Sequence, residues 1–168
     1  MKINYTIAEC PLGLLLVAAT DKGICSVTIG DKVGGLAEDL HAEFPQADIT
    51  RDKEQLQTQV NTLLAHLVGQ EPHPALSLDV QGTAFQKRVW EELRRIPYGQ
   101  TASYSEVARR IGQPTATRAV ARACATNPAA LITPCHRVVR EGGELGGYRW
   151  GIERKRQLLE KERETSEQ

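Results

Sequence analysis

Long hydrophobic runs are missing from this sequence of 168 residues. The longest apolar stretch, around Leu14 to Ala19, is far too short to cross a bilayer, which takes about 20 residues. It lies well inside the chain and lacks the basic flank of a signal peptide. With 40% hydrophobic residues, the composition predicts a soluble globular protein that is cytoplasmic and binds no membrane.

Cysteine pairs of the CxxC type are also missing, and the four cysteines show no spacing with histidine that a zinc site needs. Their even count fits two disulfides, but a cytosolic chain argues against them. Cys25 and Cys124 are predicted to be small buried hydrophobes and Cys10 to be a turn residue. Only Cys135 has a local setting that indicates chemistry.

Net charge is zero for the whole chain, but its two halves differ strongly. Residues 1–82 contain 5 Lys and Arg against 11 Asp and Glu, whereas residues 83–168 contain 16 against 10. An acidic half of net charge −6 joined to a basic half of +6 favours contact between the basic half and a polyanion. Ordinary unevenness of surface charge is the alternative.

The acidic half combines strand-like and helix-like patterns. Turn residues such as Asp21-Lys22-Gly23 separate its first β-type runs, and apolar residues at helical spacing follow. The expected strands are Lys2–Ala8, Leu14–Ala19, Ile24–Ile29 and Leu76–Val80, and the expected helices are Val33–Glu43 and Lys53–Leu67. This pattern predicts a small α/β domain over residues 1–82, in which no residues look catalytic.

The basic half predicts a second domain over residues 83–168, built mainly from helices. Thr83 can cap the first helix, and Ser103 and Glu106 have the spacing of a capping box at the start of the second. Helices are expected over 84–96, 104–111, Thr115–Ala125 and Ile152–Glu164, with a hairpin, or wing, between Val138–Arg140 and Glu144–Leu145.

Two of these short helices, joined by a glycine-containing turn, suggest a helix-turn-helix. The second of them contains five alanines, and its Arg118 and Arg122 share one face. Such a slim helix can enter a DNA groove, where arginines contact the backbone or the bases. The alternative is a helix that packs closely against its neighbours through small residues. The basic character of this half favours DNA.

The run Pro134-Cys135-His136-Arg137 places a thiol beside an imidazole in a rigid bend. An ordinary thiol is only a few per cent ionised near pH 7, so a nucleophile needs a base or a positive setting. Adjacent side chains of an extended segment point to opposite faces, so we expect a water between Cys135 and His136. Glu160 and Glu162 are candidates to orient the imidazole. A purely structural thiol and histidine are the alternative.

Seven motifs, in order along the basic half, match one known family. They are Gly82-Thr83-Ala84-Phe85-Gln86, Ile96-Pro97-Tyr98-Gly99, Ser103-Tyr104, Arg118-Ala119-Val120, Asn127-Pro128, Pro134-Cys135-His136-Arg137-Val138 and Gly147-Tyr148-Arg149-Trp150-Gly151. On these residues the chain resembles the methylated-DNA–protein-cysteine methyltransferases, or O6-alkylguanine-DNA alkyltransferases, and in particular the C-terminal repair half of a bacterial adaptive-response protein. The resemblance implies an α+β fold, with a small ribonuclease H-like N-terminal α/β domain and a winged helix-turn-helix-like C-terminal domain.

The resemblance also implies direct-reversal DNA repair without a cofactor. Cys135 would take the alkyl group from O6-methylguanine, and from O4-methylthymine, in a displacement that leaves a thioether, so each molecule would act once. His136 would accept the thiol proton through a water, and Glu162 would orient His136. Asn127 would brace the segment that contains the nucleophile. The partner would be double-stranded DNA containing O6-alkylguanine, bound by a monomer.

DNA contacts follow from the same resemblance. The alkylated base cannot be reached inside the stack, so it would be flipped out. Arg118 would fill the gap that the flipped nucleotide leaves, and Tyr104 would contact the rotated phosphate and the base. Further expected DNA contacts are Ala116, Thr117 and Arg122, and the expected pocket residues are Tyr104, Cys124, Val138, Tyr148 and Arg149.

Two departures from the family pattern affect these expectations. Arg149 and Trp150 stand where some members have small residues, which suggests a narrow pocket that disfavours bulky alkyl groups. The zinc ligands of some animal members are not reproduced, so no metal is expected. Three other functions are alternatives. One is a protein that binds the lesion without transferring the alkyl group, against which Cys135 argues. The others are a DNA-binding regulator switched by methylation and a Cys-His hydrolase.

Overall fold

The computed structural model describes residues 1–166 and divides into two compact units. The first unit contains residues 1–81 and 128–130, and the second contains residues 82–127 and the chain from Leu131 onward. Placement of residues 128–130 in the first unit was not predicted from the sequence. None of the helices within the described residues has the length and hydropathy to span a membrane.

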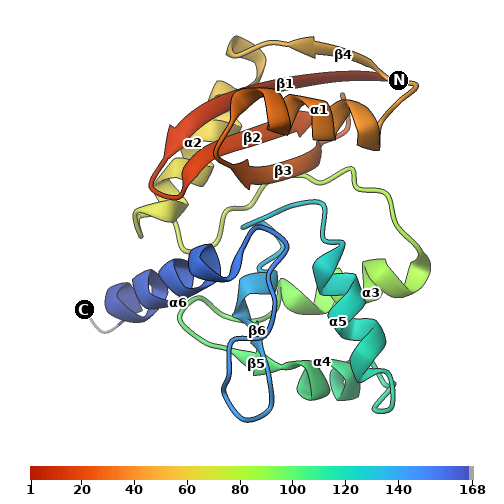
Figure 1. The fold of residues 1–168 in the computed structure, drawn as a ribbon, viewed down its shortest axis with the longest axis vertical. Helices are drawn as coiled ribbons and strands as arrows, with labels where there is room; N and C mark the ends of the chain where they lie inside the picture. Colours follow the sequence, from red (N-terminus) through yellow and green to blue (C-terminus); the bar gives the residue numbers. More distant parts are fainter. Residues whose placement is uncertain (167–168) are drawn as a thin grey trace. The chain divides into compact units, whose positions relative to one another are not determined.

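The first unit is built on a four-stranded sheet in the order β3-β2-β1-β4 (Figure 1). Its elements are β1 (Lys2–Cys10), β2 (Gly13–Ala19), β3 (Ile24–Gly30), α1 (Val33–Glu43), β4 (Asp48–Arg51), the 3₁₀ turn η1 (Glu54–Leu56) and α2 (Gln57–Leu67). Strands β1, β2 and β3 pair antiparallel, and β4 pairs parallel to β1. The first three predicted strands and both predicted helices are confirmed, the second helix being preceded by η1.

Both faces of this sheet are buried. Leu16 and Ala18 of β2 pack in one core cluster with Leu40 of α1. The alternate residues Leu15 and Val17 point to the other face and are also fully buried. Figure 1 shows α1 in front of the sheet and α2 behind it. Burial on both faces explains why these strands contain nearly continuous apolar runs.

The predicted strand Leu76–Val80 is wrong. Only Leu78 forms a bridge there, parallel to Ile24 of β3. The next stretch of the same edge is occupied by residues 128–130, because Val27 donates to Pro128 and accepts from Ala130 through its main chain at 2.9 and 3.0 Å. The edge of β3 is thus covered by two separate segments, and neither has room for a full strand.

The second unit consists of short helices around one small parallel pair of strands. Its elements are α3 (Ala84–Leu93), β5 (Ala102–Ser103), α4 (Tyr104–Arg110), α5 (Thr117–Ala125), the 3₁₀ turn η2 (Cys135–Arg137), β6 (Val138–Val139) and α6 (Ile152–Ser166). The predicted caps are confirmed: Thr83 and Gln86 form a reciprocal capping box, and Ser103 accepts from the main chain of Glu106 at 3.0 Å.

The predicted wing differs from the structure. Val138 and Val139 pair in parallel with β5 instead of antiparallel with Glu144–Leu145. Arg140 donates to the main-chain carbonyl of Glu144 at 2.8 Å, so a tight turn forms, but no strand follows within the described residues. The Val138 carbonyl accepts instead from the side chain of Lys155 in α6, as described below.

Helix α5 both packs inward and exposes its arginines. Val120 and Ala123 are buried, and the indole nitrogen of Trp90 in α3 donates to the Ala123 carbonyl at 2.8 Å. The helix begins two residues later than predicted, after Ala116, which offers no side-chain cap. Close packing through small residues therefore coexists with an outward basic face.

Candidate active site

Cys135 lies at the start of η2 and is only 3% exposed. The side-chain amide of Asn127 donates to its Sγ at 3.2 Å and to the Thr133 carbonyl at 2.8 Å. Asn127 is itself fully buried, so these bonds hold the segment before the thiol in place. Leu131, with φ of 73°, reverses the chain between these anchors, in a conformation that non-glycine residues adopt at some cost.

Burial sets the resting state of the thiol. It raises the pKa of Cys135 to about 11, against the hydrogen bond from Asn127 and the nearby charges of Lys155 and Arg149, which lower it. The resting group is therefore a neutral thiol near pH 7. A nucleophilic role needs a base that removes its proton.

His136 and Glu162 form a buried pair that can supply this base. His136 is fully buried, and its Nε2 lies 2.6 Å from Glu162 Oε2. Glu162 also accepts from the guanidinium of Arg137 at 2.8 and 3.2 Å and from the main chain of Gly99 at 3.3 Å. Burial alone would raise the pKa of Glu162, but the hydrogen bonds from His136 and Arg137, together with the charge of Arg137, lower it to about 2.

The charge of Glu162 determines which imidazole nitrogen carries the proton. An ionised carboxylate can only accept, so His136 donates from Nε2 and keeps a lone pair on Nδ1. That Nδ1 is buried and has no hydrogen-bond partner among residues 1–166. Burial also lowers the pKa of His136, so the ring is neutral near pH 7. Of the two glutamates left open by the sequence, Glu162 touches His136, whereas Glu160 is exposed.

Lys155 is a buried cation that sequence reasoning missed. Its side chain is fully buried, and its Nζ donates to the main-chain carbonyls of Val138 at 2.6 Å and Gly147 at 3.0 Å. Burial lowers its pKa to about 8, against the nearby thiols, which raise it. Its position on α6, on the same face as Leu158 and Glu162, was the available signal. Lys155 ties β6 to the loop that forms one wall of the pocket.

A pocket of about 250 Å³ opens directly beside the thiol. Its lining residues are Tyr104, Ala121, Cys124, Ala125, Cys135, Gly147, Tyr148 and Arg149. Four of the five predicted pocket residues are among them; Val138 is not, and its carbonyl accepts from Lys155 instead. The volume lies below that of drug-sized pockets and suits one nucleobase.

The pocket wall contains one further polar group without a partner. The hydroxyl of Tyr148 is buried and makes no hydrogen bond within residues 1–166. The Tyr148 ring meets His136 edge-on at 6.4 Å and Trp150 at 5.3 Å. Trp150 is 7% exposed and packs against the Tyr148 ring. It is not among the residues that line the pocket, so the prediction that Trp150 itself narrows the pocket is wrong.

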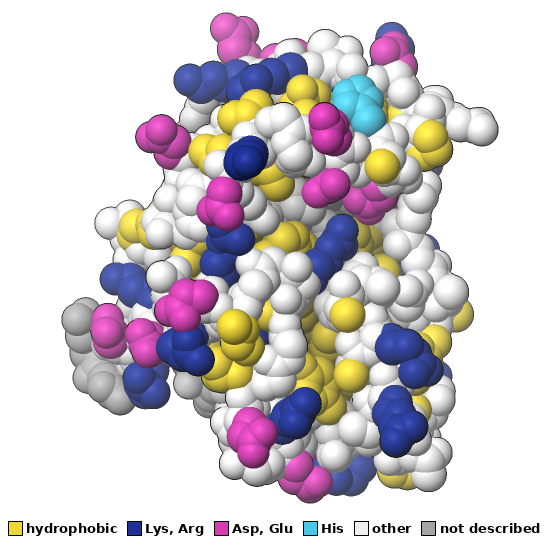
Figure 2. All heavy atoms as spheres, viewed as in Figure 1, with side chains coloured by type: hydrophobic (Ala, Val, Ile, Leu, Met, Phe, Trp, Pro, Cys, Tyr) yellow, Lys and Arg dark blue, Asp and Glu magenta, His cyan; other side chains and the backbone are white. Residues whose placement is uncertain are grey.

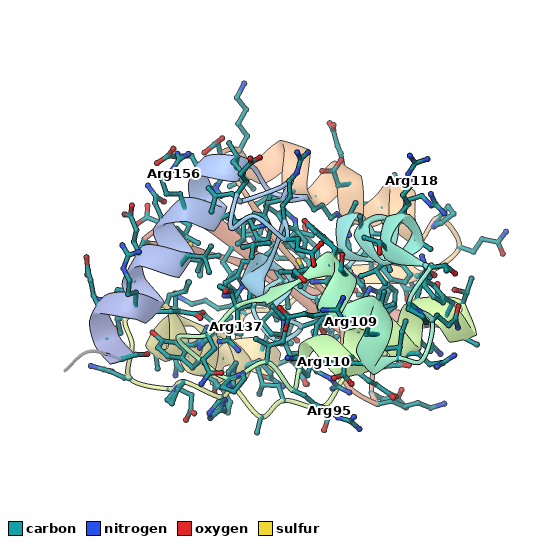
Figure 3. The ribbon with its side chains drawn as sticks, turned by 90° about the horizontal axis from the view of Figure 1, so that it is seen from below. Arg95, Arg109, Arg110, Arg118, Arg137 and Arg156 are labelled. Carbon is teal, nitrogen blue, oxygen red and sulfur yellow. The ribbon has the colours of Figure 1, made fainter. Side chains whose placement is uncertain are left out.

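The residues predicted to bind DNA lie along α4 and α5. Arg118 and Arg122 are exposed, Ala116 and Thr117 are half-buried at the start of α5, and Tyr104 reaches the pocket from the start of α4. Lys and Arg side chains gather over α5 in Figure 2. Figure 3 shows Arg118 at the outer side of α5, whereas Arg137 lies among the helices.

Comparison with known proteins agrees with this site. Residues 84–164 match the family model of the 6-O-methylguanine DNA methyltransferase DNA-binding domain. The chain is 38% identical over 164 residues to a methylated-DNA–protein-cysteine methyltransferase of Mycolicibacterium paratuberculosis, covering 98% of this chain and 94% of that protein. The chain belongs to the methylated-DNA–protein-cysteine methyltransferase family.

One further relative and one solved structure are also similar to this chain. It is 47% identical over 167 residues to the bifunctional transcriptional activator/DNA repair enzyme Ada of Escherichia coli, covering 99% of this chain but 47% of Ada. The chain thus spans about half the length of Ada. A crystal structure of Mycobacterium tuberculosis OGT in complex with DNA shares its fold at a TM-score of 0.84, with 37% identity over 96% of this chain and 94% of that one. The predicted α+β class, with ribonuclease H-like and winged helix-turn-helix-like parts, agrees with such structures.

Proposed function

We propose that this protein repairs DNA by moving the alkyl group of O6-methylguanine onto Cys135, once per molecule. The observation that carries the proposal is a buried thiol in a pocket of nucleobase size, beside an imidazole with a free Nδ1. Family membership supports the same chemistry. A Cys-His hydrolase would need no helix with outward arginines next to its nucleophile.

The transfer is a single displacement in which atoms and protons balance. His136 Nδ1 takes the thiol proton through a water, and the thiolate attacks the methyl carbon. The S–C bond forms as the bond from that carbon to the guanine O6 breaks, and the guanine keeps the electron pair. The proton then passes to the guanine, which leaves unmodified. Glu162 stabilises the imidazolium between these steps because it lies 2.6 Å from Nε2.

The product explains why each molecule acts once. A thioether has no S–S bond that a thiol can attack, so exchange with cellular thiols cannot restore Cys135. Single use also tolerates a deeply buried thiol, because turnover and product release from the sulfur are not required. The same chemistry extends to O4-methylthymine, whose methyl is likewise bonded to an exocyclic oxygen of the base.

Double-stranded DNA is the proposed partner, bound by one monomer. The flipped nucleotide enters the pocket, and unstacking costs a few kcal/mol, less for a poorly paired lesion. Arg118 fills the gap in the stack, and the alanines of α5 allow close approach in the minor groove. Tyr104 contacts the rotated phosphate and the base, while Arg122, Thr117 and Ala116 contact the DNA along the helix. Binding is therefore largely independent of sequence.

Alkyl size is limited by the wall that Tyr148 and Arg149 form. Both residues line the pocket, and Trp150 fixes the Tyr148 ring from behind. Oligonucleotides with O6-benzylguanine should therefore react more slowly than those with O6-methylguanine. Equal single-turnover rates for the two substrates would contradict a narrow pocket.

Counting the transferred methyl groups tests the function. The protein is incubated with excess duplex oligonucleotide that contains O6-methylguanine labelled in the methyl group. Label on the protein should reach a plateau near one methyl per molecule and disappear in Cys135→Ala. Binding without transfer, or turnover well above one, would overturn the proposal. The same assay with O4-methylthymine tests the second substrate.

A further inference from the structure

Arg149 places a guanidinium on the pocket wall that the transfer described above does not use. Its NH1 donates to the main-chain carbonyl of Asn127 at 2.6 Å. The guanidinium also lies over the Trp150 ring, 5.2 Å from its centroid. A guanidinium has five N–H donors. Among residues 1–166, Arg149 donates one hydrogen bond, to the Asn127 carbonyl, and no carboxylate forms an ion pair with Arg149. Its charge is therefore not neutralised by the protein.

The contacts of Arg149 continue to the nucleophile. Arg149 holds the main chain of Asn127, and the side chain of Asn127 donates to Cys135 Sγ at 3.2 Å. We propose that Arg149 is a positioning residue for the thiol, which fixes Asn127 through its carbonyl and adds positive charge beside Cys135. This inference rests on the proposed function, since it concerns the same nucleophile.

The local structure explains why an arginine suits this position. Asn127 lies two residues beyond the end of α5, near the carbonyls of the last turn, where cations are favoured. The cation–π contact with the Trp150 ring restricts the planar fork, so less freedom is lost when it bonds to Asn127. A lysine supplies the charge but cannot stack and bond in the same way.

The charge acts on the ionisation of the thiol. A cation near a buried thiol favours the thiolate and opposes the effect of burial, which raises the pKa of Cys135. Loss of the charge lowers the thiolate fraction at neutral pH and slows attack by Cys135. The deficit should shrink as the pH rises, because more of the thiol is then ionised in both proteins.

Alkylation of Cys135 by iodoacetamide without DNA tests this role directly. The rate is followed by mass spectrometry of the peptide that contains Cys135, over a series of pH values. In Arg149→Gln it should be about tenfold lower near neutral pH, equivalent to one pKa unit, and approach the wild-type rate in alkali. Arg149→Lys, which retains the charge, should stay within about threefold of wild type. Arg95→Gln removes an exposed arginine that pairs with Glu92 and serves as the matched control with an unchanged rate.

A double-mutant cycle tests the path through Asn127. Because Arg149 acts partly through Asn127, the loss in Arg149→Gln should be smaller in an Asn127→Ala background than in the wild type. Thermal unfolding of each variant shows whether it is folded at the temperature at which the alkylation rates are compared. Unchanged Cys135 alkylation in folded Arg149→Gln, an equal loss in Arg149→Lys, or full additivity would each overturn the inference.

These outcomes are separable from those of the proposed function. The alkylation assay needs no DNA, so it can succeed even if methyl transfer to Cys135 does not occur. If methyl transfer occurs with wild-type rate in Arg149→Gln, the proposed function stands and the role of Arg149 fails. If Arg149→Gln does not fold, Arg149→Lys alone tests the contribution of charge. A tenfold lower rate of Cys135 alkylation in Arg149→Lys would then contradict the proposed role of the charge.

Discussion

The two units of the chain bury different kinds of side chain. In the first unit, the buried residues of the sheet and helices are mostly apolar, with Leu15, Leu16 and Ile3 fully enclosed. The second unit buries the ionisable groups Lys155 and Glu162, together with His136 and Arg137. Buried ions cost several kcal/mol each before pairing repays it, so an apolar core would be no less stable. The first unit thus illustrates folding by hydrophobic burial, and the second a core arranged around one thiol.

Figure 2 shows the same contrast at the surface. Asp and Glu side chains are frequent over the elements of the first unit, whereas Lys and Arg gather over α5 of the second. The sequence halves differ in the same sense, from net −6 to net +6. Function is therefore expected to respond to changes in the second unit, and stability alone to changes in the first.

Glu162→Gln should break the second unit most severely. The amide oxygen of glutamine can still accept from His136 Nε2, but the negative charge that stabilises a protonated His136 is lost. The buried guanidinium of Arg137 also loses its carboxylate partner. We expect methyl transfer to slow by about 100-fold or more and the free energy of unfolding to fall by about 3 kcal/mol. Single-turnover kinetics and denaturant unfolding measure the two effects. A rate within threefold of wild type would contradict the role of Glu162.

Leu40→Ala is the corresponding change in the first unit. Leu40 is 2% exposed in the core cluster between α1 and the sheet. Its truncation should lower the free energy of unfolding by about 2–5 kcal/mol, from lost burial and a cavity. The single-turnover rate of the folded fraction should not change. If that rate falls tenfold, the expectation that changes in the first unit affect stability alone is wrong.

Acid should weaken the second unit through the same ionisable pair. The pKa of Glu162 is about 2 in the folded protein against its ordinary value of 4.5, so the unfolded chain binds the proton more readily. Stability from this carboxylate is present above about pH 5 and is lost as the pH falls toward 2. Burial lowers the pKa of His136, which adds a loss that begins below its ordinary value of 6.5.

Urea unfolding between pH 7 and pH 3 measures this dependence. Wild type should lose about 2 kcal/mol over this range from Glu162, because the full loss is reached only below pH 2. Glu162→Gln lacks the titrating carboxylate and should show a flatter profile. Parallel profiles for the two proteins would show that the pKa of Glu162 is not lowered in the folded state.

Arg118→Ala and Arg122→Ala should have smaller effects, and these effects are expected on DNA binding. Loss of Arg118 from the DNA stack should weaken binding by about tenfold and slow transfer, with little change in salt dependence. Loss of a phosphate contact at Arg122 should weaken binding less and lower the salt slope by about one. Fluorescence titrations at several salt concentrations separate the two. Identical behaviour of both variants would contradict the distinct roles.

Local patterns were enough to predict most elements. Apolar β-type runs bounded by turn residues predicted β1 to β3, and caps at Thr83 and Ser103 predicted α3 and α4. The strand at Leu76–Val80 failed because its partner edge is shared with residues 128–130, which lie far away in the sequence. The wing failed because the pairing with residues 144–145 stops at Arg140, and the Val138 carbonyl accepts from the distant Lys155 instead.

The candidate site was predicted largely through motifs, and its buried charges were not. Cys135, His136 and Asn127 lie within a few residues of each other, so their proximity is local. Lys155 contacts Val138 and Gly147 only after α6 packs onto β6, which a single sequence does not reveal. The choice of Glu162 over Glu160 depends likewise on the helix face that meets His136.

Mass spectrometry of the cysteine peptides after repair tests the central claim most directly. The protein is incubated with excess duplex DNA containing O6-methylguanine, digested, and its four cysteine peptides are compared. The peptide of Cys135 should be heavier by one CH₂ in nearly all molecules, while those of Cys10, Cys25 and Cys124 stay unchanged. Repaired DNA with an unmodified Cys135, or a methyl group on another cysteine, would contradict the account.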